Sequence, residues 1–270
     1  RLVSKDEASA VEVLLKRAPT ENVFPRGTLR RYVRGERFAR VWRDEGEPVS
    51  SAAPEGVVVA QVQGNCTLCV PFDGSEALCA AFIEEQWSRR IATGLQQISG
   101  MARPLARVLP LLRGMRLGPQ RVLEYARLVG PPHGLASPKL VGRVRRIVPG
   151  ELDVVERCYA GGVWSAQTAG RREAAERGHV YILDVDGEAA AAAYVHPLLD
   201  DAGIIRAVYT PLGLRCRGYA TALVEGMSRA LWERGVTPCL MYDDPSAGRI
   251  YHRLGYVDFG QWQAVQLQPG

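Results

Sequence analysis

The stretch Ala207-Val-Tyr-Thr-Pro-Leu-Gly-Leu-Arg-Cys-Arg-Gly-Tyr-Ala-Thr221 combines the end of a strand, a short loop and the start of a helix. The segment from Ile204 to Tyr209 is largely β-branched and apolar, which predicts a buried strand that Pro211 ends. A helix is predicted from about Gly218, because apolar residues from Ala220 to Leu231 recur at a spacing of three and four. Strand, loop and helix therefore follow one another without a gap.

The start of this helix has a chemical use. The first helical turn carries backbone N–H groups without an intrahelical partner, and the helix dipole adds partial positive charge there. Such a turn binds phosphate when no side chain blocks the approach. Gly218 leaves the approach open, and Arg215 and Arg217 add positive charge beside it. We therefore expect an anionic ligand, and a diphosphate fits best. The stretch has neither the ending of a Walker loop nor the Gly-x-Gly-x-x-Gly turn.

The segment Arg215-Cys-Arg-Gly218-Tyr-Ala220 resembles the acyl-CoA loop of the GNAT acetyltransferase superfamily, whose pattern is Arg/Gln-x-x-Gly-x-Gly/Ala. Three further phrases resemble bacterial acetyltransferases of this superfamily: Val208-Tyr-Thr-Pro211, Arg217-Gly-Tyr-Ala-Thr-Ala-Leu-Val224 and Arg249-Ile-Tyr-His-Arg-Leu-Gly-Tyr256. The predicted element order over residues 139–268 also matches this fold: strand, two helices, three strands, helix, strand, helix and two strands. The strands are expected at 141–147, 179–185, 188–195, 204–209, 238–242, 256–262 and 263–267, and the helices at 149–159, 164–177, 218–235 and 245–253.

The resemblance implies an α/β (α+β) fold whose mixed, mostly antiparallel sheet is flanked by helices. The best boundary is the stretch from Val129 to Pro138, where three prolines and two glycines interrupt any regular element. We assign residues 133–270 to a GNAT N-acetyltransferase domain and residues 1–132 to a smaller, degenerate GNAT-like α/β domain. In the first half, Leu95-Gln-Gln-Ile-Ser-Gly100 followed by Pro104 resembles the middle strand and turn of the fold. That half has no phosphate-loop pattern, so it is expected not to bind CoA.

Other segments of the first half are assigned from local signals. Ser4 to Glu7 matches a capping box ahead of a helix. Strands at 57–63 and 67–71 flank a hairpin position, and helices are expected at 76–89 and 104–112. The segment 119–129 fits neither the helical nor the strand period, so it is left unassigned.

Bulk properties indicate a cytoplasmic globular protein. The chain has 270 residues, of which 47% are hydrophobic and 23% charged, and it contains no apolar run of membrane-spanning length. Its start lacks the apolar core of a signal peptide, and its six cysteines are scattered. Cys66 and Cys69 form a lone C-x-x-C, so no metal site is expected. The net charge of +5 suits a highly negative ligand such as CoA, and neither nucleic acid nor a membrane is expected as a partner.

The resemblance implies a binding site for acetyl-CoA as cosubstrate. In the family, the backbone of the strand before the loop pairs with the pantetheine arm, and the loop N–H groups hold the pyrophosphate. Carried over, the cofactor-binding residues are Val208, Tyr209, Thr210, Arg215, Cys216, Arg217, Gly218, Tyr219, Ala220 and Thr221.

The resemblance also assigns a catalytic residue. The family places a tyrosine near the CoA sulfur, and here it is Tyr251, the proton donor to the leaving thiolate. Ala247, Tyr251 and Leu254 share one helical face, so a packed core tyrosine is the alternative. Related sequences carry asparagines where this chain has Asp244 and Gly248, which bears on CoA affinity and activity.

The function implied is transfer of an acetyl group to an unidentified amine, by direct attack of the amine on the thioester. The acceptor is a small-molecule or a protein amine, and a homodimer is possible. The general base stays open between water and the pair Asp200 and Asp201. The alternative is a non-catalytic CoA-binding or interaction protein that retains the fold; binding of nucleic acid ranks last.

Overall fold

The computed structural model describes residues 2–36, 39–43, 58–62, 65–69, 79–81, 83–85, 96–148, 150–160, 162 and 168–269. The chain forms two compact units: unit 1 comprises Arg1–Glu124 and Gly260–Gly270, and unit 2 comprises Tyr125–Phe259. Strands β5 (Met115–Leu128) and β11 (Tyr256–Pro269) each contribute to both units. The domain boundary between residues 132 and 133 stays a prediction.

Unit 1 begins with two helices that pack on a sheet. Its elements are α1 (Ala8–Leu15), α2 (Val23–Val33), β1 (Ala39–Arg43), β2 (Val58–Val62), β3 (Asn65–Cys69), β4 (Gln97–Met101) and α4 (Ala102–Val108). The predicted capping box precedes α1: Ser4 N–H donates to Glu7 Oε2 at 3.0 Å, and Glu7 N–H donates to Ser4 Oγ at 3.3 Å. Within this unit the strand order is β1-β2-β3-β4-β11-β5.

Unit 2 holds the stretch with which the sequence analysis begins. Its elements are α5 (Pro138–Val141), β6 (Val144–Arg146), α6 (Leu152–Tyr159), α7 (Thr168–Glu176), β7 (Val180–Val185), β8 (Glu188–Leu198), β9 (Ala202–Tyr209), α8 (Tyr219–Trp232), β10 (Thr237–Tyr242) and α9 (Pro245–Leu254). The strand order is β11-β5-β10-β9-β8-β7-β6. Neighbours from β6 to β9 pair antiparallel, whereas β9 and β10 pair in parallel.

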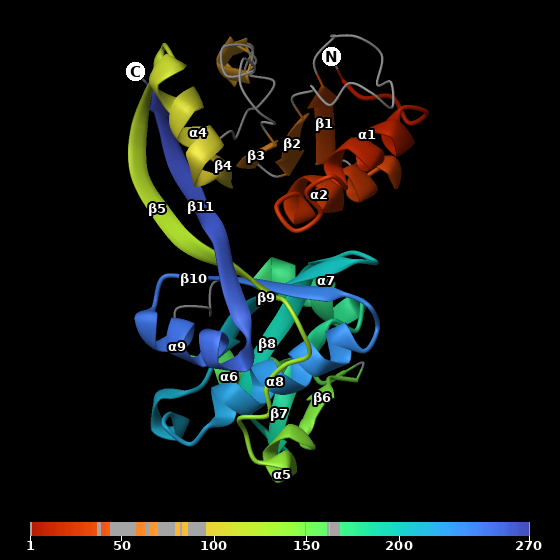
Figure 1. The fold of residues 1–270 in the computed structure, drawn as a ribbon, viewed down its shortest axis with the longest axis vertical. Coiled ribbons are helices and arrows are strands. Elements are labelled where there is room, and N and C mark those ends of the chain that lie inside the picture. Colours follow the sequence, from red (N-terminus) through yellow and green to blue (C-terminus); the bar gives the residue numbers. More distant parts are fainter. Residues whose placement is uncertain are drawn as a thin grey trace. The chain divides into compact units, whose positions relative to one another are not determined.

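Helices cover both faces of the unit 2 sheet (Figure 1). On one face, Leu223 and Met227 of α8 and Leu254 of α9 pack against Leu183 and other strand residues. On the other face, side chains of α6 and α7 pack against alternate positions of the same strands. Because successive strand side chains point to opposite faces, each strand supplies both cores. The predicted mixed, mostly antiparallel sheet flanked by helices is confirmed.

Three strand assignments need correction. The last two strands, predicted at 256–262 and 263–267, form the single strand β11, which continues because Trp262 to Gln266 pair with β4. Most of the unassigned segment 119–129 belongs to β5. The residues of β5 before Leu123 are mostly exposed on both faces, so they show no alternation of apolar and polar residues. The strand predicted at 141–147 is only β6, because residues 138–141 form α5.

Two predicted helices fall partly on residues that lie outside the described ranges. Of the helix predicted at 76–89, only residues 79–81 and 83–85 are described. The helix predicted at 164–177 is seen as α7, and residues 163–167 lie outside the described part.

Candidate active site

Strand β9 parts from β10 before it reaches the loop. The parallel register of the two strands runs from Ala202↔Thr237 to Ile205↔Leu240. Arg206–Tyr209 extend beyond this register toward Pro211. Ala207 lies in this extension and has a φ of 52°, in the left-handed region. The end of β9 is therefore irregular where the sequence analysis places the cofactor-binding residues Val208, Tyr209 and Thr210.

The loop after β9 leads to a helix N-terminus that no side chain caps, as the sequence analysis expects. Gly218 caps α8 with a φ of 77°, and no side chain makes a capping hydrogen bond there. The first intrahelical bond runs from the Ala222 N–H to the Gly218 carbonyl at 2.9 Å. Within the described residues, the N–H groups of Tyr219, Ala220 and Thr221 have no acceptor. A helix end of this kind attracts anions.

Two left-handed residues shape this loop. Cys216, which is exposed, has a φ of 61°, two residues before Gly218. Left-handed residues within a turn draw successive N–H groups into an anion-binding concavity. An alanine-like side chain at Gly218 would meet no atom within 4 Å, so positive φ is what favours glycine there.

The two loop arginines are exposed, and their side chains contact the loop itself. Arg215 Nε donates to the Thr210 carbonyl at 3.1 Å, and its guanidinium lies 5.9 Å from the centre of the Tyr209 ring. Arg217 Nη2 donates to the Gly213 carbonyl at 3.4 Å. Arg215 thus ties the end of β9 to the loop.

Thr210 has a buried hydroxyl for which the described residues provide no partner. The residue is 8% exposed, and its hydroxyl is buried without a hydrogen bond within the described part of the chain. Burying an unpaired hydroxyl costs free energy, so such a group usually has a ligand or water as a partner. Thr210 directly follows β9 and begins the loop that leads to α8.

Tyr251 lies on the buried face of α9, as predicted from its spacing with Ala247 and Leu254. It is 7% exposed, and its ring contacts those of Tyr242 and Tyr256 at centroid distances of 5.5 and 6.1 Å. Within the described residues no hydrogen bond engages its hydroxyl. Burial raises the pKa of Tyr251 above its ordinary value, so the hydroxyl stays protonated near neutral pH. The hydroxyl is therefore present as a hydrogen-bond donor and not as a base.

The two positions that depart from the family pattern have clear local roles. Asp244 caps α9: its Oδ1 accepts from the Ser246 hydroxyl and from the Ser246 N–H, each at 2.7 Å, and these bonds hold the pKa of Asp244 below its ordinary value. Gly248 provides room, because a Cβ built there would stand 2.5 Å from Cε2 of Tyr242. Tyr242 therefore occupies the space that a side chain at position 248 would need.

A polar cluster beside this site escaped the sequence analysis. The Tyr242 hydroxyl donates to the Asp258 carboxylate at 2.9 Å and lies 2.9 Å from His252 Nε2. His252 Nε2 also lies 2.9 Å from Asp258 Oδ2. His252 lies on the surface, since its side chain is 49% exposed. Its partners are 10 and 6 residues away in sequence, and no motif marks them.

The pair Asp200 and Asp201 lies at the end of β9 opposite the loop. Both residues form the turn between β8 and β9, and the Asp201 carbonyl accepts from the Thr237 N–H at 2.9 Å. This turn precedes β9, whereas the loop follows it. Eight strand residues at about 3.3 Å each separate the two ends by roughly 25 Å. Turn formation explains the pair, and the identity of the general base stays open.

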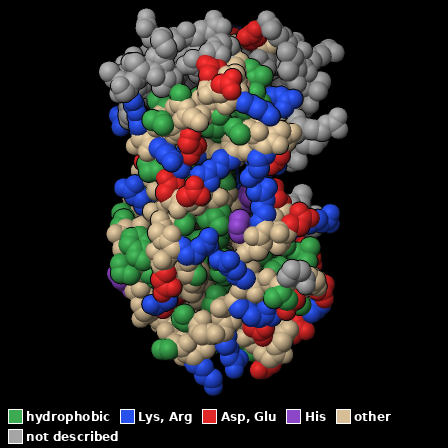
Figure 2. Space-filling model, turned by 90° about the vertical axis from the view of Figure 1, so that its right-hand side faces the viewer, with side chains coloured by type: hydrophobic (Ala, Val, Ile, Leu, Met, Phe, Trp, Pro, Cys, Tyr) green, Lys and Arg blue, Asp and Glu red, His purple; other side chains and the backbone are tan. Residues whose placement is uncertain are grey.

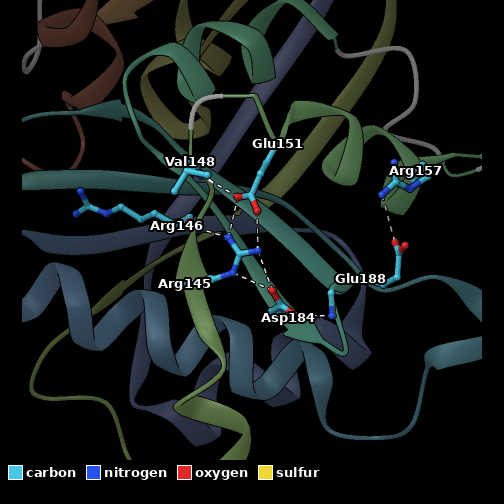
Figure 3. Close-up of polar contacts among 8 residues, drawn as sticks. Arg145, Arg146, Val148, Glu151, Arg157, Asp184 and Glu188 are labelled. Atoms are coloured by element: carbon cyan, nitrogen blue, oxygen red, sulfur yellow. Dashed lines mark hydrogen bonds and ion pairs between the residues drawn. The ribbon is translucent and has the colours of Figure 1, made fainter.

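Ion pairs fix the start of α6 (Figure 3). Arg145 of β6 donates to both oxygens of Glu151, at 2.7 and 2.9 Å, and pairs with Asp184 of β7 at 2.7 Å. These bonds to Arg145 hold the pKa values of Glu151 and Asp184 below their ordinary range. Glu151 also accepts from the Val148 N–H at 2.8 Å. The network joins two strands to the helix that carries Tyr159.

Charges are mixed over the surface. On the face shown in Figure 2, Lys and Arg side chains are interspersed with Asp and Glu side chains. Across the described residues, no group of three or more His, Cys, Asp or Glu side chains could hold a metal ion. None of the described helices has the length and apolar character needed to cross a membrane.

Comparison with known proteins decides the fold. The family model described as "FR47-like protein" matches residues 182–264, from β7 into β11. An acetyltransferase of the GNAT family from Colwellia psychrerythraea is similar over 100% of this chain and 99% of its own, with a TM-score of 0.60 and 10% identity. The chain has the GNAT fold. This confirms the resemblance on which the sequence analysis relied.

Other solved structures share the GNAT fold over the whole chain. A GCN5-related N-acetyltransferase from Sphaerobacter thermophilus is 15% identical, covers 100% of this chain and 96% of its own, and has a TM-score of 0.56. A tandem GNAT protein from the clavulanic acid biosynthesis pathway is 13% identical, covers 100% and 98%, and has a TM-score of 0.60. No curated protein sequence matches the chain. At these identities the likeness concerns the fold.

Proposed function

We propose that this GNAT-fold protein is an acetyl-CoA-dependent N-acetyltransferase. The observation that carries the proposal is the continuous path from the end of β9, which has left its pairing with β10, into the uncapped N-terminus of α8. A strand end that no longer pairs with β10, a buried hydroxyl and an anion-binding helix end follow one another within residues 206–221. A CoA thioester has the same order of chemical groups: an amide-bearing arm followed by a diphosphate.

The diphosphate end is assigned to the start of α8. The N–H groups of Tyr219, Ala220 and Thr221 would donate to its oxygens, and Cys216, Arg217 and Gly218 would shape the turn beneath them. Exposed Arg215 and Arg217 lie within the same loop and add positive charge. Each of these residues belongs to the predicted cofactor-binding set.

The pantetheine arm is assigned to the end of β9. Backbone groups of Val208, Tyr209 and Thr210 would pair with its amides as a neighbouring strand does. The Thr210 hydroxyl, which is buried and unpaired within the described residues, would gain a partner in the ligand. Because the diphosphate is assigned to the loop, the thioester end would lie alongside β9 near Val208, where β10 no longer pairs.

The bound thioester supplies an acetyl group that a neutral amine can attack. The amine nitrogen bonds to the acetyl carbon, and the carbon–sulfur bond breaks as the thiolate leaves. The Tyr251 hydroxyl, kept protonated by burial, donates a proton to that thiolate. Water accepts the surplus proton of the amine. Holding the two reactants side by side supplies a large part of the rate increase.

A second candidate function is CoA binding without turnover. It is favoured by the packing of Tyr242 on Gly248, where relatives carry asparagine, and by the position of Asp200 and Asp201 far from the loop. The two functions differ in one measurable product. Purified protein is incubated with acetyl-CoA and a panel of amines: a polyamine, free amino acids, an aminoglycoside and a lysine-containing peptide. Acceptor-dependent thiol release supports transfer, whereas binding without release supports the second candidate.

A further inference from the structure

A buried hydrogen bond connects helix α6 to the irregular end of β9. The Tyr159 hydroxyl donates to the carbonyl oxygen of Ala207 at 2.6 Å, and both residues are buried. Tyr159 ends α6, whereas Ala207 precedes the three β9 residues assigned to the pantetheine arm. The bond spans 48 residues of sequence, and the sequence analysis gave Tyr159 no role.

Ala207 is the extra residue of a β-bulge. In the register of β8 with β9, Ala192 pairs with Tyr209 and Tyr194 pairs with Arg206. Between these two pairs β8 advances by two residues and β9 by three, so β9 carries one extra residue. Ala207 has a φ of 52°, a conformation that its Cβ disfavours. An alanine keeps this conformation only where its surroundings hold it.

The Tyr159 bond also sets the direction of a second group. The Ala207 carbonyl and the Val208 N–H belong to one planar peptide group, and in a trans peptide they point in opposite directions. When the carbonyl points to Tyr159, the Val208 N–H therefore points away from α6. At this position β9 extends beyond its register with β10. The N–H is thus aimed where the acyl-CoA arm is assigned.

The Tyr159 ring is itself held on both sides. The guanidinium of Arg171, a residue with 0% exposure, lies 4.3 Å from the centre of the ring and makes two hydrogen bonds to Glu156. The Tyr209 ring stacks on Tyr159 at 5.7 Å. A Cβ at Gly162 would stand 2.6 Å from Cζ of Tyr209, so Tyr209 has no room to move in that direction. Burial raises the pKa of Tyr159, so its hydroxyl remains a donor.

We propose that Tyr159 is a positioning residue that holds the Ala207 bulge and thereby aims the Val208 N–H at the acyl group. Its hydroxyl contacts the strand and not the substrate. Turnover should therefore depend on it while the affinity for acetyl-CoA does not. This inference rests on the proposed acetyltransferase function.

The test compares Tyr159→Phe with Tyr181→Phe. The first variant keeps the ring and its contact with Arg171 but loses the bond to Ala207. The second loses a buried hydroxyl that accepts from Arg146 Nε at 3.0 Å. Thiol release from acetyl-CoA is measured with the best amine of the panel or, without one, with water. Amide hydrogen exchange of residues 204–210 is measured by mass spectrometry in the absence of ligand.

For Tyr159→Phe we expect kcat to fall about tenfold or more, because a backbone donor loses its orientation. The KM for acetyl-CoA should stay within roughly threefold, and amide exchange in residues 204–210 should accelerate. Tyr181→Phe should leave kcat, the KM for acetyl-CoA and amide exchange in residues 204–210 unchanged. Equal kcat in the two variants, or unchanged exchange in Tyr159→Phe, would overturn the proposal. If wild-type protein neither binds nor consumes acetyl-CoA, the proposed function fails, and unchanged or accelerated exchange still decides whether Tyr159 anchors the bulge.

Discussion

The ring of Tyr242 lies directly against the backbone of Gly248: a Cβ at position 248 would stand 2.5 Å from Cε2 and 3.1 Å from Cζ. The ring is fixed at its other end, where its hydroxyl donates to the Asp258 carboxylate at 2.9 Å. A side chain at position 248 would have to displace the ring or bend α9. The glycine that departs from the asparagine of related sequences is therefore compensated by a tyrosine one strand earlier.

Gly248→Ala should destabilise the protein by about 1–3 kcal/mol, the usual range for overpacking a core. The free energy of unfolding, measured by chemical denaturation, gives the cost. The same substitution in a Tyr242→Leu background should cost much less, because the side chain that it would clash with is smaller. Equal costs in the two backgrounds would show that Tyr242 does not restrict position 248.

Gly218→Glu should abolish binding of acetyl-CoA. The new carboxylate would stand at the start of α8, where it would occupy the N–H groups and repel the diphosphate. Because Gly218 has a φ of 77°, the substitution also strains the backbone, by about 1–2 kcal/mol. Titration calorimetry measures the loss of binding.

The matched control for this variant is Gly235→Glu. Gly235 has a φ of 74° and open space around its Cβ position, and it follows the opposite end of the same helix. It therefore reproduces the strain and the charge without touching the loop. Both variants should lose similar thermal stability, but only Gly218→Glu should lose binding. Loss of binding in both would mean that general destabilisation, and not the loop, is responsible.

Tyr251→Phe should lower kcat by about a hundredfold or more while leaving the affinity for acetyl-CoA nearly unchanged. The substitution removes only a hydroxyl that has no partner among the described residues. Since burial raises the pKa of Tyr251, activity should not decline at moderately alkaline pH through its ionisation.

The control is Tyr256→Phe, which removes another buried hydroxyl, 2.7 Å from Ser228 Oγ. It should lose some stability through that bond but retain kcat. If Tyr251→Phe turns over as fast as wild type, Tyr251 is a core residue without a catalytic role.

Arg145→Met should make the stability of the folded protein less dependent on pH in the acid range. The bonds to Arg145 lower the pKa values of Glu151 and Asp184 in the folded state. The two carboxylates therefore stabilise the fold fully above their unfolded-state pKa values of about 4. This stabilisation is lost as the pH falls through their lower pKa values in the folded state. Without Arg145 the melting temperature should drop at pH 7, and the fall in stability below about pH 4 should become shallower.

Arg157→Met is the comparison for this variant. Arg157 pairs with Asp153, whose side chain is 66% exposed, and with Glu188, whose side chain is 69% exposed. Figure 3 shows the pair with Glu188. Exposed pairs contribute little, so this variant should melt within a few degrees of wild type. An equal loss of stability in both variants would contradict a special role for the Arg145 network.

Local signals made much of unit 2 predictable. A loop entering a helix through Gly218, a cap at Asp244 and left-handed glycine at Gly255 are each determined within a few residues of sequence. The order of strands and helices follows from apolar periodicity and from these signals. The same reasoning placed Tyr251 on the buried face of α9, because its neighbours at i−4 and i+3 are apolar.

What the sequence analysis missed depends on distant partners. The bulge at Ala207 has no local signature, since alanine usually avoids positive φ and Tyr159 holds it from 48 residues away. The clash that keeps position 248 a glycine comes from the preceding strand. The side of the loop on which Asp200 and Asp201 lie depends on the direction of β9, which puts the pair at the opposite end of the strand.

The most direct test of the central claim is a calorimetric titration of the purified protein with acetyl-CoA and, separately, with CoA. The account predicts micromolar binding of both ligands, because the diphosphate and the pantetheine arm provide most of the contacts. Absence of binding at millimolar acetyl-CoA would contradict it: the GNAT fold would stand, but the loop at Gly218 would not be a cofactor site.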